Sequence, residues 1–189
     1  MSEQKLFDVA HKVQLLLQKE DIQNCIVGGL ACNLYGSERQ TKDVDILISD
    51  KSWEKCIQLL DSDKEFVLAD VVQDDSKTMY KLVYNEQNVD FLKGKPDGFG
   101  PKPTIFTEPL NTIKDFTVAQ ITDILQMKLA ALTRNKATDV EDIIYLIHLF
   151  EDYSTSDAWW ENLAKKKAFT NNNQKLWRQK WALLKRFLQ

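Results

Sequence analysis

Histidine is scarce in this chain, and cysteines are few and odd in number. His11 and His148 are the only histidines among 189 residues, so a histidine-based zinc site is not expected. The three cysteines, Cys25, Cys32 and Cys56, form no Cys-x-x-Cys pair. An odd number without paired spacing favours reduced thiols in a cytoplasmic protein over a disulfide framework.

Long apolar runs and an excess of one charge are also missing. No apolar run approaches the roughly 18 residues that a membrane-spanning helix needs, so we expect no membrane partner. The first residues, Met-Ser-Glu-Gln-Lys, lack the basic-then-apolar order of a secretion signal. A net charge of -3 gives no overall attraction to nucleic acid, so any such contact would be a local patch.

The chain does contain a compound motif between residues 26 and 48. Gly28-Gly29 ends a short apolar run, and Asp43-Val44-Asp45 begins a second one. A glycine pair between a strand and a helix lets the backbone approach a ligand, and the N–H groups of that helix favour an anion such as phosphate. Asp43 and Asp45 would share one face of a strand, where a divalent cation would relieve their repulsion. The motif therefore indicates metal-assisted phosphoryl chemistry.

This motif resembles the signature of the nucleotidyltransferase superfamily, which has a polymerase-β-like fold. Val27-Gly28-Gly29, a spacer over residues 30–42 and Asp43-Val44-Asp45-Ile46 match that signature. The order Gly-Ser-x-Arg-x-Thr-x-Asp-x-Asp over residues 36–45 is more narrowly similar to the AbiEii-type branch, which includes toxin-like nucleotidyltransferases. The resemblance implies an α+β fold, in which helices flank a mixed β-sheet and a helical bundle follows at the C-terminus.

The resemblance also implies a set of catalytic carboxylates. Asp43 and Asp45 would hold Mg²⁺, with Mn²⁺ as the alternative metal, against the phosphates of a nucleoside triphosphate such as ATP. Asp90 is a lone acid in the apolar segment 88–92 and would be the third carboxylate. It would ligate metal or deprotonate the acceptor hydroxyl. Asp70 is the competing candidate, and a solvent-facing strand end is the purely structural alternative for Asp90.

Phosphate contacts are expected from the glycine pair and from the loop that follows it. Gly28 and Gly29 would contribute backbone N–H groups. Arg39 and Thr41 would contact phosphate or shape the loop, since a guanidinium matches phosphate geometry, and Ser37 is a further candidate. Ordinary loop polarity is the alternative interpretation of these side chains.

A later segment resembles the remaining motifs of the AbiEii branch. Lys128, on a predicted helix, would pair with triphosphate charge. Asp142, or less favourably Asp139, would orient that lysine or the nucleotide base. Solvated charges on the helix surface are the alternative.

Hydrophobic periodicity and turn residues predict the surrounding elements. Residues 93–103 contain three glycines and three prolines, which break regular structure. We therefore expect an α/β core over residues 1–112 and a helical region over 113–189 packed on it, with one compact unit as the alternative. The predicted helices span residues 5–20, 30–35, 51–60, 118–133, 139–150, 156–167 and 174–188, and the predicted strands span residues 24–27, 44–49, 66–72, 78–84 and 89–92.

The last predicted helix combines basic residues with Trp177, Trp181 and Phe187. Exposed aromatics between basic groups would suit RNA, through phosphate contacts and base stacking. Trp177, Trp181, Leu184 and Leu188 share one helical stripe, however, which favours aromatic side chains packed in a core.

The leading hypothesis is a Mg²⁺-dependent nucleotidyltransferase. It would move a nucleoside monophosphate from an NTP to a hydroxyl of tRNA or other RNA, of a protein or of a small molecule, and release pyrophosphate. One alternative is a catalytically silent nucleotide-binding or interaction module with the same fold, and another is the toxin of a toxin–antitoxin pair. Fold alone does not select the acceptor.

Overall fold

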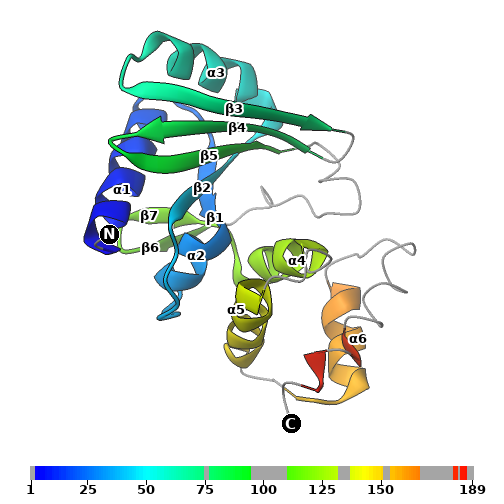
Figure 1. Ribbon diagram of the computed structural model, residues 1–189. Coiled ribbons are helices and arrows are strands. Elements are labelled where there is room, and N and C mark those ends of the chain that lie inside the picture. The colour runs from blue at the N-terminus through cyan, green and yellow to red at the C-terminus, as the bar shows by residue number, and fades with distance from the viewer. Residues whose placement is uncertain are drawn as a thin grey trace.

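A seven-stranded mixed sheet flanked by helices forms the framework (Figure 1), which confirms the predicted fold class. The structure, a computed structural model, describes residues 3–74, 77–94, 110–131, 137–150, 154–166, 181–182 and 184–186. The strands are β1 (Asn24–Val27), β2 (Asp43–Ile48), β3 (Phe66–Asp74), β4 (Lys77–Tyr84), β5 (Gln87–Lys93), β6 (Asn111–Ile113) and β7 (Phe116–Val118). The helices are α1 (Glu3–Lys19), α2 (Gly28–Leu34), α3 (Trp53–Ser62), α4 (Ile121–Ala131), α5 (Ala137–His148) and α6 (Asp157–Lys166), with a short 3-10 turn, η1 (Asp50–Ser52), before α3.

The strand order across the sheet is β3-β4-β5-β2-β1-β7-β6. The pairs β2–β5 and β1–β7 are parallel, and the other neighbours are antiparallel. The five predicted strands are all present. The sequence did not predict the hairpin of β6 and β7, and the expectation that a helix begins at Val118 is wrong. Val118 pairs with Ile26 of β1, and the helix begins at Ile121.

One face of the sheet is covered by α1 and α3. Gln14 of α1 donates to Asn24 of β1, and Trp53 of α3 packs edge-on against Tyr80 of β4. Successive strand residues point to opposite faces, so Asp45, one residue before buried Ile46, lies on the other face. The acid motif therefore lies on the face that α1 and α3 leave uncovered.

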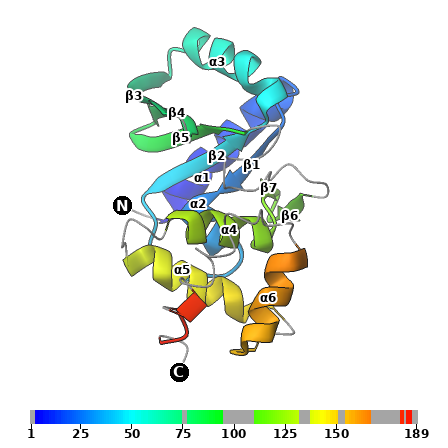
Figure 2. The ribbon, with the colours of Figure 1, turned by 90° about the vertical axis from the view of Figure 1, so that its right-hand side faces the viewer.

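The later helices gather at the end of the molecule opposite to α3 and β3. In both views α4, α5 and α6 lie together at the lower end of the molecule, and α3 lies at the upper end next to the strands β3–β5 (Figures 1 and 2). The sheet includes β7, so sheet residues extend beyond the predicted boundary at residue 112. The division into units at residues 1–112 and 113–189 stays a prediction. Within the described ranges, no helix combines the length and apolarity needed to span a bilayer.

The aromatic residues near the C-terminus that the structure describes are packed. Trp181 stacks on Trp160 of α6 with 4.6 Å between ring centroids and 6° between ring planes, and Leu184 is fully buried. This burial supports the core interpretation for Trp181 rather than base stacking. Most of the predicted helix 174–188, including Trp177 and Phe187, lies outside the described residues.

A buried polar network joins α1 to two strands and gives a stability prediction. The Gln14 amide nitrogen donates to Asn24 Oδ1 and to the carbonyl of Thr117, both at 2.9 Å, and its oxygen accepts from the Thr117 N–H. Gln14→Ala would leave these buried groups without partners, so we expect the free energy of unfolding to fall by about 2 kcal/mol. Urea titration would measure the loss, with Gln18→Ala on the exposed side of α1 as control. An equal loss in both variants would contradict the prediction.

Candidate active site

The three predicted carboxylates lie on two adjacent parallel strands. Asp45 of β2 is in register with Asp90 of β5, and Asp43 is in register with Asn88. The side-chain amide of Asn88 donates to Asp43 Oδ1 at 3.0 Å. Asp70, the competing candidate, is on β3, at the edge of the sheet and two strands away from β5. The structure thus places Asp90, and not Asp70, beside the Asp43–Asp45 pair.

The Gly28-Gly29 turn packs directly against the Asp45 carboxylate. Gly28 has φ of +67°, a conformation that favours glycine, and a Cβ at this position would overlap the Asp45 side chain. The backbone N–H of Gly29 donates to Asp45. A Cβ on Gly29 would come within 2.6 Å of Thr41 Oγ1 and would also meet the Arg39 guanidinium. The turn therefore brings β1, the Arg39 loop and the acid pair together without intervening side chains.

Burial and neighbouring charge raise the pKa of Asp45. Desolvation is the largest cause, followed by the negative charges of Asp90 and Asp43, and together they raise the pKa from 3.8 to about 6. Lys128 and the Gly29 hydrogen bond act in the opposite direction. The Asp45 carboxylate is thus held in a position where its negative charge is poorly compensated.

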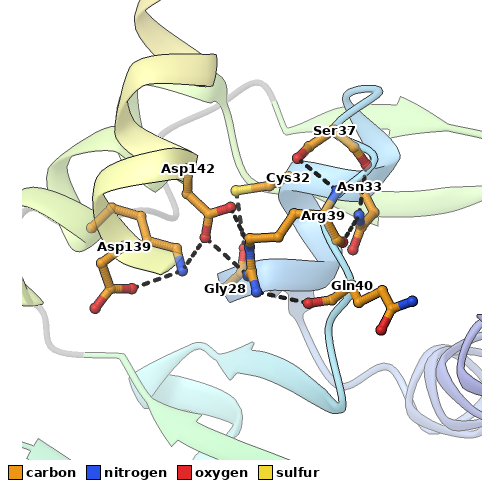
Figure 3. Close-up of polar contacts among 9 residues, drawn as sticks. Gly28, Cys32, Asn33, Ser37, Arg39, Gln40, Asp139 and Asp142 are labelled. Carbon is orange, nitrogen blue, oxygen red and sulfur yellow. Dashed lines mark hydrogen bonds and ion pairs between the residues drawn. The ribbon is translucent and has the colours of Figure 1, made fainter. Parts of the chain in front are cut away.

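The cations of the site converge on one fully buried carboxylate, Asp142 of α5 (Figure 3). Arg39 makes a two-pronged contact with it, from Nε to Oδ1 at 2.7 Å and from Nη2 to Oδ2 at 3.0 Å. Lys128 Nζ lies 2.6 Å from Asp142 Oδ2 and 3.1 Å from Asp139 Oδ1. Desolvation would lower the pKa of Lys128, but its hydrogen bond to Asp142 and the charge of that group raise it, so the lysine stays protonated.

The loop between α2 and β2 is shaped by Ser37 and also by Asn33 and Cys32, which the sequence did not single out. Asn33 donates its amide to the carbonyls of Ser37 and Arg39, both at 2.6 Å (Figure 3). Ser37 Oγ accepts from the Arg39 N–H at 3.4 Å and is buried, so in this structure it shapes the loop. Cys32 donates to the Gly28 carbonyl. The only sign of this role in the sequence is that Asn33 is a polar residue one helical turn before the loop.

The cysteines stay thiols. Cys25, Cys32 and Cys56 are all free, as predicted, and all three are buried. Burial, followed by the charge of Asp142, raises the pKa of Cys32 to about 12, so this thiol is protonated at neutral pH.

The donor chemistry of the site fits a hard divalent cation. Asp43, Asp45 and Asp90 offer carboxylate oxygens. Burial, followed by the charges of Asp90 and Asp43, raises the pKa of Asp45, and such a cation would relieve the repulsion among the three groups. In the part of the chain that the structure describes, no three His, Cys, Asp or Glu side chains already stand at metal-ligand distances. An ion held by all three carboxylates would require them to draw closer together.

The comparisons with known proteins agree with this fold. No family model and no curated protein sequence matches the chain. It is similar to the solution structure of the antibiotic-resistance factor ANT(2'')-Ia, with a TM-score of 0.63 and 10% identity over 99% of this chain and 98% of that one. A crystal structure of ANT(2'')-Ia in complex with adenylyl-2''-tobramycin gives a TM-score of 0.59 and 12% identity over 84% of this chain and 94% of that one.

A third structure, the lincomycin-bound lincosamide antibiotic adenylyltransferase LnuA, has a TM-score of 0.50 and 20% identity over 79% of this chain and 99% of that one. At identities this low, the likeness establishes the fold. The chain therefore has the fold of nucleotidyltransferases, and the narrower similarity to the AbiEii-type branch stays a prediction.

Proposed function

We propose that this chain, with its nucleotidyltransferase fold, transfers a nucleoside monophosphate from an NTP to an acceptor hydroxyl. The observation that carries the proposal is the register of Asp45 with Asp90, with Asp43 on the same face and the Gly28-Gly29 turn against Asp45. Neighbouring carboxylates on one face of a sheet, one of them with a raised pKa, are typical of functional sites.

Each group would have a distinct part in the reaction. Asp43, Asp45 and Asp90 would hold Mg²⁺ or Mn²⁺, which supplies charge stabilisation for the NTP phosphates. The acceptor oxygen forms a bond to the α-phosphorus, the bond from that phosphorus to the bridging oxygen breaks, and pyrophosphate leaves. The glycine turn is the proposed phosphate site, and Asp90 lies on the side of Asp45 away from it. Asp90 would therefore face the acceptor and take the proton of its hydroxyl.

The remaining polar groups would bind the triphosphate. Arg39 and Lys128 already lie together at Asp142, on the side of β2 where the glycine turn lies. A phosphate at the turn would replace Asp45 as the acceptor of the Gly29 N–H, which would leave that carboxylate to face Asp90. Thr41, beside Gly29, would fix the width of this turn, and Asp142 would hold both cations in place.

The structural neighbours support a small-molecule acceptor as the first class to test. The ANT(2'')-Ia complex contains adenylylated tobramycin, and LnuA is an adenylyltransferase of lincosamide antibiotics. We therefore propose a hydroxyl-bearing small molecule as the acceptor ahead of tRNA or other RNA, and ATP as the first NTP to assay.

Pyrophosphate release is the direct test. Wild-type protein with Mg²⁺, each of the four NTPs and panels of small molecules, tRNA and proteins should release pyrophosphate and label one acceptor class. Asp43→Asn and Asp90→Asn should lose this activity by about a hundredfold or more, because each removes a carboxylate from the reacting centre. Asp70→Asn, at the sheet edge, is the matched control and should keep it.

Two outcomes would overturn the proposal. Transfer that survives in Asp43→Asn and Asp90→Asn would show that these carboxylates are not the catalytic groups. Mg²⁺-dependent stabilisation by NTP in a thermal shift assay, with no labelled acceptor in any panel, would instead favour the silent nucleotide-binding module.

A further inference from the structure

A row of charged residues extends from the proposed reacting centre on β2 and β5 across two more strands. Asp45 of β2 is in register with Asp90 of β5, Asp90 with Lys81 of β4, and Lys81 with Asp70 of β3. Residues in register on neighbouring strands share a face of the sheet. Lys81 therefore lies on the same face as the acid pair and directly beside Asp90, although 36 residues separate Lys81 from Asp45 in the sequence.

Lys81 lies on the opposite side of the carboxylates from the other cations of the site. The glycine turn leads from β1, on one side of β2, whereas β5 and β4 follow on the other side. Neighbouring strands are about 4.8 Å apart, so the Lys81 backbone is roughly 10 Å from that of Asp45 and roughly 15 Å from that of β1. Arg39 and Lys128 lie together at Asp142, on the side where we propose that the triphosphate binds. Lys81 is thus placed for the acceptor rather than for the NTP.

We propose that Lys81 selects the acceptor by binding an anionic group, a phosphate or a carboxylate, next to the hydroxyl that Asp90 deprotonates. This inference rests on the proposed function. Because Lys81 is on the strand next to Asp90, the hydroxyl and the anionic group would lie within about one strand spacing of each other, roughly 5 Å. Short hydroxy acids and phosphorylated polyols or sugars meet this requirement.

The side chains around Lys81 suit this task. Along β4 its neighbours on the same face are Met79, 7% exposed, and Val83, half-buried. They give the lysine stem apolar support, and Lys81 itself keeps partial exposure. The competing explanation is that Lys81 only balances the charges of Asp70 and Asp90 on the neighbouring strands. In that case its loss would change stability but not the choice of acceptor.

Paired acceptors distinguish the two explanations. Transfer from α-³²P-labelled ATP would be compared for glycerol against glycerol 3-phosphate, glycerol against glycerate, and ribose against ribose 5-phosphate. Wild type should label the anionic members at least about tenfold faster, and Lys81→Met should reduce that ratio to near one. Lys81→Arg should retain the preference. The phosphate and carboxylate pairs show which anion is recognised.

A binding measurement keeps the inference testable if none of these compounds is an acceptor. Inorganic phosphate and acetate would be titrated into ¹⁵N-labelled protein held with Mg²⁺ and a non-hydrolysable ATP analogue. Amide shifts at residues 79–83 should saturate in wild type and weaken about tenfold in Lys81→Met. Lys93→Met is the control, because Lys93 is on the next strand but on the opposite face, where it pairs with Asp50 of η1 and lies over the Trp53 ring of α3.

The outcomes separate this inference from the proposed function. Equal anion preference and equal binding in wild type and Lys81→Met would overturn the role of Lys81 while leaving transfer intact. Transfer that persists in Asp43→Asn would overturn the proposed function instead. A change in stability alone, with unchanged acceptor ratios, would establish the charge-balancing explanation.

Discussion

Asp45→Asn should abolish transfer and at the same time stabilise the metal-free protein at pH 7. The loss of activity should reach about a thousandfold, because a metal-ligating carboxylate contributes several kcal/mol to charge stabilisation in phosphoryl transfer. The gain in stability has a separate cause. Ionised Asp45 is poorly solvated and is repelled by the charges of Asp90 and Asp43, whereas a neutral asparagine of the same shape removes that repulsion.

The sign and the pH window of the stability effect follow from the pKa of Asp45. Burial and the adjacent carboxylates raise it from 3.8 to about 6 in the folded protein. Between these values the folded state binds more protons than the unfolded state, so the stability of wild type falls as pH rises through this window. One pKa unit corresponds to about 1.4 kcal/mol, so Asp45→Asn should be more stable by about 2–3 kcal/mol above pH 7 and little changed below pH 4.

Urea denaturation in EDTA at pH 4 and at pH 7.5 would measure this difference. Asp61→Asn, an exposed acid on α3, is the control and should show no gain at either pH. Added Mg²⁺ should stabilise wild type by binding to the folded state and should stabilise Asp45→Asn much less. An asparagine variant that is no more stable than wild type at pH 7.5 would show that the charge of Asp45 is well compensated in the folded protein.

Much of the sheet could be predicted from local sequence. Short apolar runs bounded by turns identify β1, β2 and β5, and their positions set the face on which Asp43 and Asp45 lie. The hairpin of β6 and β7 could not be found in this way. Each of its strands has only three residues, and Val118 fits the apolar stripe of the following helix equally well. Its pairing with Ile26 is a long-range contact without a local signal.

The candidate site shows the same division between local and long-range information. The glycine pair and the acid pair are encoded within one stretch of sequence, because a turn and the alternation of a strand bring them together. Lys81 is different, since its place beside Asp90 depends on the register of β4 with β5. The resemblance to AbiEii-type proteins suggested that Asp142 orients Lys128. It did not suggest that the same carboxylate also binds Arg39, 103 residues earlier in the chain.

Asp142→Ala should cause the largest loss of stability among the site variants, about 3–5 kcal/mol. The Asp142 side chain is fully buried and compensates two cations, Arg39 and Lys128, at 2.6 to 3.0 Å. Removing it would leave the Arg39 guanidinium without a carboxylate partner and Lys128 with Asp139 alone, which is costly at low dielectric. Because Arg39 would no longer be fixed beside Gly29, we also expect a weaker affinity for NTP.

A double-mutant cycle would establish whether the loss comes from the stranded cations. The double variant Lys128→Met/Asp142→Ala should lose less stability than the sum of the two single variants. Asp142→Ala leaves the charge of Lys128 poorly compensated, and Lys128→Met removes that charge. Glu141→Ala, an exposed acid next to Asp142 on α5, is the matched control and should change stability by no more than about 0.5 kcal/mol. Equal losses for Glu141→Ala and Asp142→Ala, or strict additivity in the cycle, would mean that Asp142 does not hold the two cations together. In that event the loop that carries Arg39 must be fixed to α5 by other contacts, and the hydrogen bond from Tyr145 of α5 to the carbonyl of Tyr35, at the end of α2, is one candidate.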